Sequence, residues 1–286
     1  MHDGLAWLAA SPEGADWLER LPGMLSDCAD RWSLDLGEPF AEAFESLAVP
    51  GERTDGSHVV LKLAFRGREN EHEAAALAHW SGDGAVVLLD YHPGCNALLL
   101  ERAEPGTPLA SEPAEAALEV YADLLPRLWQ PAGPPFRTLV DEAAWWAGDI
   151  ERDWASAGRP IERELLDVAL KALHELPATQ GELVLVHQDL HAGNVLRARR
   201  QPWLAIDPKP ILAEREFSLA PIVRGTELGH SREAVLRRLN RLCDALDLDR
   251  DRARRWTIAQ TLAWAITDSG TIEEHVEASR WLAEGA

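Results

Sequence analysis

One polar segment constrains this chain more than any other part of its sequence. Residues 186–196 have the form His-x-Asp-x-x-x-x-Asn, in which the acid is Asp189 and the amide is Asn194. A further acid, Asp207, ends the next apolar run, within residues 203–208. Apolar runs of this length on either side of a glycine-containing loop are typical of short strands. The fold must therefore place two strand ends and one tight polar loop close together.

These residue types suit phosphoryl transfer. That reaction needs an acceptor hydroxyl held in line with a γ-phosphate, and metal ions that offset the charge of the phosphates. Asp189 could accept the hydroxyl proton, while Asn194 and Asp207 offer the oxygen ligands that Mg²⁺ prefers. We therefore predict Asp189 as the catalytic base, Asn194 and Asp207 as metal ligands, and ATP with Mg²⁺ as the required cofactors.

Two other interpretations of the same segment stay open. His187 and His191 are four residues apart, which is a familiar spacing of transition-metal ligands on a helix. The loop character of the segment and the lack of an HExxH glutamate argue against that interpretation. The segment could also be a buried polar turn without chemistry.

Composition narrows the class of protein. The chain has 286 residues, of which 46% are hydrophobic, so it can bury a substantial core. Its cysteines, Cys28, Cys95 and Cys243, form no CxxC pair, which argues against a disulfide framework or a zinc ribbon. The first residues lack the basic start of a secretion signal. We expect a cytoplasmic protein.

The net charge of the chain limits the classes of partner that it can bind. The formal net charge of -20 argues against nucleic acid, whose binding depends on Lys and Arg. The longest apolar stretches have the length of strands, so we expect no membrane partner. An acidic protein favours a cationic small molecule as acceptor, although acidity can also serve solubility alone. The oligomeric state does not follow from the sequence.

The spacing of apolar residues divides the chain into three parts. Residues 1–33 have helical apolar spacing and form an N-terminal arm. Residues 34–103 read as strands around one helix, with a turn at 54–57, a helix over 66–80 and a strand over 85–89. Residues 104–286 begin with a breaker-rich link at 104–108 and are otherwise mainly helical, with helices over 114–129 and 140–154 and from Ser231 onward.

The motifs resemble those of the aminoglycoside phosphotransferase family. Residues 187–196 and 206–208 are similar to its catalytic and metal-binding motifs. Residues 203–208 and 97–102 read like segments of its streptomycin and hydroxyurea phosphotransferase branch. The resemblance covers roughly residues 32–285. It implies an α+β fold of the bilobal protein-kinase-like type, with a small β-rich N-lobe that has one helix and a larger, mainly helical C-lobe.

The resemblance also implies a nucleotide site. Lys62 stands on the third expected strand, where such kinases place the lysine that contacts the α- and β-phosphates, and Glu73 would pair with it. The phosphate-covering hairpin would lie at residues 44–46 and use Ser46, although it lacks glycine. Adenine would bind the backbone of Glu101 and Ala103.

Two residues depart from the family pattern. Gln188 replaces a glycine before the leucine-flanked aspartate, and Ser218 stands where many relatives have an aspartate that braces the catalytic loop. Neither change removes a reacting group. Lys209 adds a cation after Asp207 for which the sequence suggests no role.

The acceptor site is predicted from acids and aromatics that could hold guanidinium or ammonium groups. Part of this set follows helical spacing on one predicted helix, where the tryptophans could equally be core residues. The candidates are Asp141, Trp145, Asp149, Glu214, Trp264 and Asp268.

These expectations define an ATP- and Mg²⁺-dependent kinase that phosphorylates a hydroxyl of a small, cationic molecule, an aminoglycoside such as streptomycin, and so confers antibiotic resistance. A metabolic kinase for an amino sugar or another small metabolite, and a hydroxyurea phosphotransferase, are alternatives that differ only in the acceptor. A degenerate nucleotide-binding protein is the alternative outside the enzymes, and the intact Lys62, Asp189, Asn194 and Asp207 argue against it.

Overall fold

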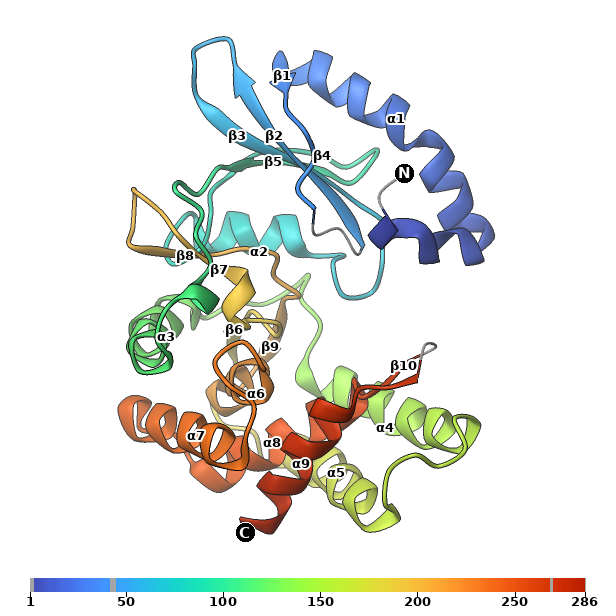
Figure 1. Cartoon of the computed structure of the whole chain (residues 1–286), viewed down its shortest axis with the longest axis vertical. Helices are drawn as coiled ribbons and strands as arrows, with labels where there is room; N and C mark the ends of the chain where they lie inside the picture. The colour runs from blue at the N-terminus through green and yellow to red at the C-terminus, as the bar shows by residue number, and fades with distance from the viewer. Residues whose placement is uncertain (1–2, 42–44, 268–269, 286) are drawn as a thin grey trace. The chain divides into compact units, whose positions relative to one another are not determined.

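The computed structural model describes residues 3–41, 45–267 and 270–285. The chain forms two compact units, Met1–Gly106 and Thr107–Ala286. Figure 1 shows the elements of each unit. In chain order they are η1 (Asp3–Ala10), α1 (Pro12–Trp32), β1 (Leu34–Leu36), β2 (Ser46–Arg53), β3 (His58–Ala64), α2 (Glu73–Trp80), β4 (Leu88–His92), β5 (Ala97–Glu101), η2 (Leu109–Ser111), α3 (Ala114–Leu128), α4 (Leu139–Ser156), α5 (Arg163–Glu175), η3 (Leu176–Thr179), β6 (Val184–Val186), η4 (Ala192–Asn194), β7 (Val195–Arg197), β8 (Trp203–Ala205), β9 (Ile211–Ala213), η5 (Arg215–Leu219), α6 (Ala220–Arg224), α7 (Arg232–Leu246), α8 (Arg250–Ala263), β10 (Ile266–Thr267), β11 (Gly270–Thr271) and α9 (Glu273–Glu284).

An antiparallel sheet with the strand order β1-β2-β3-β5-β4 forms the centre of the first unit. The predicted turn at residues 54–57 joins β2 to β3. Gly56 has a φ of 81°, a conformation that a glycine adopts without steric cost, and the Asp55 carboxylate accepts from the Ser57 amide at 2.9 Å. This local chemistry sets the register of the hairpin that presents Lys62.

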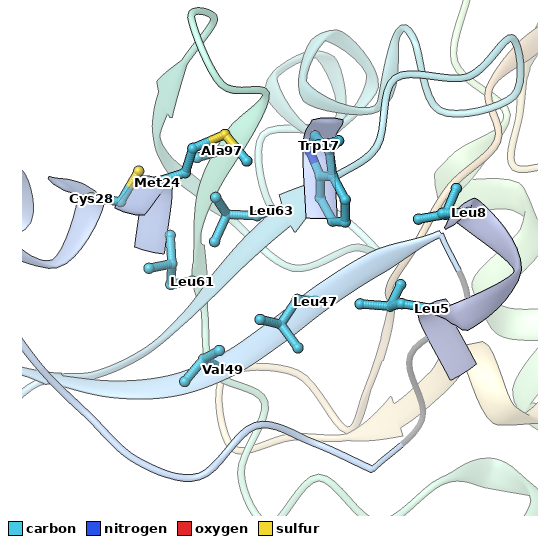
Figure 2. Packing of buried hydrophobic residues seen from close by; sticks show 10 residues of the cluster. All are labelled: Leu5, Leu8, Trp17, Met24, Cys28, Leu47, Val49, Leu61, Leu63 and Ala97. Carbon is cyan, nitrogen blue, oxygen red and sulfur yellow. The ribbon is translucent and has the colours of Figure 1, made fainter. Parts of the chain in front are cut away.

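Alternation along β3 separates the core from the candidate phosphate lysine. Successive strand side chains point to opposite faces, so Leu61 and Leu63 share one face and Lys62 takes the other. The leucines pack under η1 and α1, as Figure 2 shows, and burying each contributes about 1.5–3 kcal/mol. Lys62 instead faces α2. The buried members of this cluster are Leu5, Leu8, Trp17, Met24, Cys28, Leu47, Val49, Leu61, Leu63 and Ala97.

The N-terminal arm is helical, as predicted. The Ser11 side chain caps α1 by accepting from the Gly14 amide at 3.1 Å, and Pro12 occupies the first turn. The helix ends at Ser33, which takes a left-handed conformation. The arm is thus a fixed cover of one face of the sheet.

Two predicted boundaries in this unit are wrong. The helix expected from residue 66 begins only at Glu73, because the Asn70 side chain bonds the Gly67 amide and the Phe65 carbonyl, and so holds the chain in a loop. The strand expected over 85–89 lies instead at Leu88–His92, where the register with β5 is irregular. Apolar content alone did not show where the pairing begins.

The second unit is mainly helical, as expected. Helices α3 and α4 match the predicted ranges, and Ser231 caps α7 by accepting from the Ala234 amide. Short antiparallel pairs, β6 with β9 and β7 with β8, lie among these helices and carry the polar loop. No helix in the described ranges is long and apolar enough to cross a bilayer.

Candidate active site

His187 anchors the polar loop that follows β6. Its Nε2 lies 2.8 Å from the Ile206 carbonyl, and its own carbonyl accepts from the Lys209 amide at 3.0 Å. Burial lowers the pKa of His187 to about 4, so the ring is neutral at pH 7 and donates to that carbonyl. These contacts tie the loop to the segment that carries Asp207. They assign His187 to support of the loop rather than to a metal.

The loop holds Asn194 in one orientation beside Asp189. The Asn194 Nδ2 donates to the Asp189 carbonyl at 2.9 Å, so its Oδ1 faces elsewhere. The Asn194 carbonyl accepts from the Ile206 amide at 2.9 Å, alongside the β7–β8 pairing. Asp207 follows at once with a φ of 57°, a turn that redirects its side chain. The two predicted metal ligands therefore come from adjacent backbone segments.

This donor set fits Mg²⁺ better than a transition metal. Among the residues that the structure describes, no group of three or more His, Cys, Asp or Glu side chains is arranged to hold a metal ion. Mg²⁺ commonly takes only one or two protein oxygens and completes its shell with substrate phosphates and water. The Asn194 amide oxygen and the Asp207 carboxylate match that requirement. The histidine-based metal site is not supported, and the roles of Asn194 and Asp207 remain predictions.

Two cations lie beside the Asp189 carboxylate, and sequence reasoning missed the role of both. Lys209 Nζ is 3.5 Å from Oδ2, and Arg224 Nη2 is 3.6 Å from Oδ1. Arg224 is distant in sequence and stands on no recognised motif, so no local signal pointed to it. Lys209 was noticed only as an unassigned cation.

His191 forms an ion pair on the same loop. Its Nδ1 lies 2.7 Å from the Glu227 carboxylate. Burial opposes the charged ring, but the hydrogen bond that His191 donates to the Glu227 carboxylate and the charge of Asp189 outweigh burial and raise the pKa of His191. Burial likewise opposes the charge of Glu227, whose pKa the His191 contact lowers. The pair links the loop to the segment that carries Arg224.

The first unit contains the expected lysine pair. Lys62 Nζ donates to the Glu73 carboxylate at 2.6 Å, and both side chains are buried. Ser46 is the first residue of β2, but the neighbouring Phe44 of the expected hairpin lies outside the described residues. The pairing of Lys62 with Glu73 is confirmed, and contact of either with phosphate remains a prediction.

The expected adenine-binding segment ends β5. The Glu101 amide donates to the Val87 carbonyl at 2.9 Å, and the Glu101 carboxylate accepts from the Val87 amide. Its amide hydrogen is therefore already committed to the protein. Ala103 lies in the link after β5 and is partly buried. Contact of Glu101 and Ala103 with adenine remains a prediction.

Of the acceptor candidates on α4, Trp145 and Asp149 lie one turn apart. Trp145 is 40% exposed, and the Asp149 carboxylate pairs with Arg152 at 2.8 Å. Asp141 instead completes a capping box with Thr138, whose hydroxyl donates to its carboxylate at 2.7 Å. Asp141 thus has a structural task at the helix start, whereas Trp145 and Asp149 share one face.

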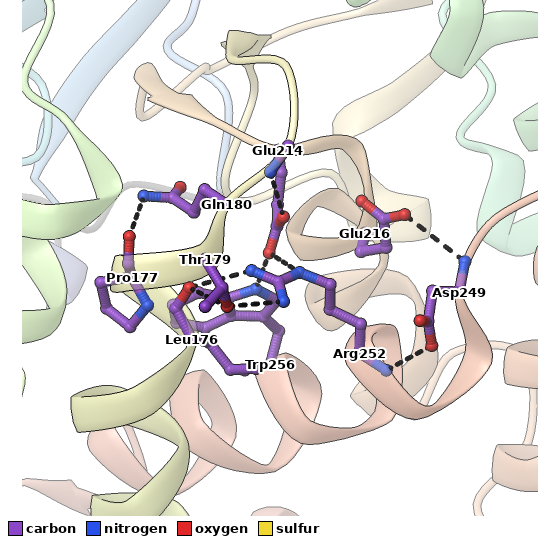
Figure 3. Close-up of polar contacts among 10 residues, drawn as sticks. Leu176, Pro177, Thr179, Gln180, Glu214, Glu216, Asp249, Arg252 and Trp256 are labelled. Atoms are coloured by element: carbon purple, nitrogen blue, oxygen red, sulfur yellow. Dashed lines mark hydrogen bonds and ion pairs between the residues drawn. The ribbon is translucent and has the colours of Figure 1, made fainter.

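The remaining candidates behave differently. Figure 3 shows Glu214 inside a polar cluster, where it accepts from Trp256, from Arg252 at 2.6 Å and from the Gly181 amide at 3.1 Å. Glu214 is only 2% exposed, so its carboxylate braces the fold and we leave it out of the acceptor site. Trp264 already has two protein cations near its ring. Asp268 lies outside the described residues.

The two departures from the family pattern have structural explanations. Gln188 has a φ of 65°, a left-handed conformation that glycine adopts more easily, and its carbonyl accepts from Gln260 at 3.1 Å. Ser218 is buried and bonds the Arg215 carbonyl and Trp129. Gln260 therefore provides a brace for the polar loop, and Ser218 is part of local packing.

Comparison with known proteins adds direct evidence. A model for the family described as aminoglycoside/hydroxyurea antibiotic resistance kinase matches residues 31–270. The chain is 39% identical to a streptomycin 6-kinase of Streptomyces glaucescens, over 91% of this chain and 87% of that protein. It is 38% identical to a streptomycin 6-kinase of Streptomyces griseus, with coverage of 94% and 92%.

A hydroxyurea phosphotransferase of Kitasatospora aureofaciens is 36% identical, over 89% of this chain and 76% of that protein. Among solved structures, a choline kinase of Streptococcus pneumoniae matches with a TM-score of 0.63 at 13% identity, over 92% of this chain and 99% of that one. At this identity the structural likeness concerns the fold alone. It confirms the predicted α+β, kinase-like fold.

Proposed function

Because the chain belongs to the aminoglycoside/hydroxyurea antibiotic resistance kinase family, we propose that it transfers the γ-phosphoryl group of ATP to a hydroxyl of streptomycin or a closely related aminoglycoside. That the protein is a phosphotransferase with an alcohol group as acceptor follows from the family. The observation that carries the choice of acceptor is the similarity to two streptomycin 6-kinases along nearly the whole chain.

The residues of the polar loop support a simple division of labour. Asp189 would orient the acceptor hydroxyl and take its proton as the new oxygen–phosphorus bond forms. Asn194 and Asp207 would hold Mg²⁺, which when bound supplies charge neutralisation at the phosphates. Lys62, fixed by Glu73, would contact the nucleotide phosphates. We expect the protein to carry out this reaction in the cytoplasm.

Charge supports a cationic acceptor. With a net charge of -20, the protein attracts cations over about a Debye length, or about 10 Å at 0.1 M salt. Trp145 and Asp149 offer an exposed ring and a carboxylate on one face of α4. An aromatic face and an acid together bind guanidinium groups through cation–π contact and ion pairing.

Hydroxyurea is the second candidate acceptor. The relative from Kitasatospora aureofaciens favours it, and so do the two cations at Asp189, which tolerate a neutral acceptor without repulsion. A housekeeping kinase for an amino sugar differs only in the acceptor, so one panel of acceptors can test all of these alternatives. Catalytic turnover of any of these compounds would exclude the degenerate nucleotide-binding alternative.

The panel compares streptomycin, hydroxyurea and amino sugars by ADP release at rising salt. We expect the highest kcat/KM with streptomycin, because it is cationic, and a decrease of that value as salt screens the attraction while the ATP KM changes less. Asp149→Asn should raise the streptomycin KM with little change in kcat. Hydroxyurea used better than every cationic compound, without salt dependence, would overturn the proposed acceptor and leave the kinase assignment intact.

Lys62→Ala should weaken ATP use without unfolding the protein. The change removes the cation proposed to contact the phosphates, and Glu73 then remains buried without it. We expect the ATP KM to rise about tenfold or more and kcat to fall, measured against Lys171→Ala, an exposed lysine on α5. Unchanged ATP kinetics with a lower melting temperature would give Lys62 a purely structural role.

A further inference from the structure

Arg224 and Lys209 approach different oxygens of Asp189. Their nitrogens lie 3.6 Å from Oδ1 and 3.5 Å from Oδ2. Charge-assisted hydrogen bonds are usually about 2.7–2.9 Å, so neither contact is a tight one. A carboxylate has about four lone-pair positions, and Asp189 therefore keeps acceptor capacity for a substrate hydroxyl. The two cations flank the place where that hydroxyl would lie.

One aromatic ring supports both cations. The Arg224 guanidinium carbon lies 4.5 Å from the Trp264 ring centroid, and Lys209 Nζ lies 5.1 Å from it. A tryptophan face attracts cations within about 6 Å. The side chains are 7% and 20% exposed, so little water screens them. The two cations thus share the Trp264 ring and the Asp189 carboxylate as partners, and an anion that binds beside Asp189 would meet two positive charges.

Arg224 is held firmly in place. Its Nη1 donates to Gln260 Oε1 at 2.9 Å, and Gln260 in turn donates to the carbonyl of Gln188, the neighbour of Asp189. The buried Arg238 guanidinium donates to the carbonyls of Val223 and Gly225, both at 2.8 Å, on either side of Arg224. The protein thus fixes the Arg224 backbone and head group before any substrate binds.

We propose that Arg224 and Lys209 contact the transferred phosphoryl group and stabilise its charge in the transition state. The proposal rests on the role of Asp189 proposed above. The acceptor oxygen bonds to the γ-phosphorus as the bond from that phosphorus to the bridging oxygen breaks, the hydroxyl proton passes to Asp189, and ADP leaves with the electron pair. Cations that are already fixed beside Asp189 contact the oxygens of the transferred phosphoryl group, and the protein does not have to rearrange during the reaction.

The alternative is that both cations only neutralise a part-buried aspartate. The two roles predict different kinetics. A phosphoryl contact acts mainly in the transition state, so its loss lowers kcat and leaves the ground-state KM nearly unchanged. A counter-ion supports the fold, so its loss lowers the melting temperature and is not repaired by a small cation of the same shape.

The test is chemical rescue of Arg224→Ala by guanidinium and of Lys209→Ala by methylammonium, each at tens of millimolar. We expect kcat for streptomycin phosphorylation to fall by about 10²–10³-fold in each variant, with the ATP KM changed by less than about threefold. The matching cation should raise the kcat of its variant at least about tenfold, and the mismatched cation should not. Arg224→Lys should recover part of it.

Arg252→Ala is the matched control. Arg252 also pairs with a buried acid, Glu214, at 2.6 Å, but its other bonds go to Thr179 and the Leu176 carbonyl. Its loss should lower the melting temperature, and guanidinium should not raise the kcat of this variant. If Arg224→Ala does not fold, Lys209→Ala, whose side chain is 20% exposed, decides the question.

Rates within threefold of wild type in both variants, or losses that no cation repairs, would overturn the proposal. The failure of the proposed function would look different. The wild-type protein would then use no acceptor of the panel, or Asp189→Asn would turn over normally. Hydrolysis of ATP, in which water is the phosphoryl acceptor, gives the same comparison of variants without streptomycin.

Discussion

Asp189→Asn should lower acceptor phosphorylation by at least about a hundredfold while ATP binding stays close to normal. The amide keeps the shape of the side chain but cannot take the hydroxyl proton, and a positioned acid–base group contributes about 10²–10⁴-fold. It also removes the charge that Arg224 and Lys209 face, so the melting temperature must be measured alongside. Single-turnover rates and ATP titration separate the chemical step from binding.

Asp251→Asn provides the control for that substitution. Asp251 is an exposed acid on α8 that pairs with Arg254, three residues further along the same helix. The same chemical change there should leave kcat and KM unaltered. Turnover by Asp189→Asn within tenfold of the wild-type rate, in folded protein, would remove Asp189 from the role of base.

Asp207→Ala should abolish Mg²⁺-dependent turnover at ordinary Mg²⁺ concentrations. The carboxylate is one of two proposed protein ligands, and its loss leaves the metal with the Asn194 amide oxygen and the nucleotide. We expect ATP affinity measured with Mg²⁺ to drop by at least about tenfold, and affinity for metal-free ATP to change much less. Mg²⁺ titration of both binding and rate gives the comparison.

Asn194 allows a sharper version of the metal test. Asn194→Ala removes both the proposed ligand and the bond to the Asp189 carbonyl, whereas Asn194→Asp retains an oxygen ligand, loses the donor and adds a negative charge. The alanine variant should need more Mg²⁺ for half-maximal rate, and the aspartate variant should not. Wild-type Mg²⁺ titrations for Asp207→Ala and Asn194→Ala would place the metal elsewhere.

Much of the fold could be predicted from local sequence patterns. The turn around Gly56, the cap at Ser11 and the alternation that turns Lys62 away from the leucines of β3 are all set by neighbours in sequence. The pairing of Lys62 with Glu73 could be predicted because the family resemblance supplied the partner. Boundaries were less certain where one side chain, such as Asn70, redirects the backbone.

The parts of the site that depend on distant contacts could not be predicted. Arg224 reaches Asp189 only because Gln260, Trp264 and Arg238 hold it there from α7 and from the C-terminal end of α8. None of these residues stands on a motif, and a buried arginine looks like a surface arginine in sequence. The burial of the acidic candidate Glu214 could not be predicted either, because the residue type alone does not show whether a side chain is buried.

The most direct test of the phosphotransferase proposal is the stoichiometry of one reaction, ATP and Mg²⁺ with streptomycin and wild-type protein. ADP release is measured together with the product by phosphorus NMR. We predict one ADP for each streptomycin consumed and a single new phosphate monoester, with no product from Asp189→Asn. ATP bound without ADP formation, with streptomycin and hydroxyurea alike, would contradict the account.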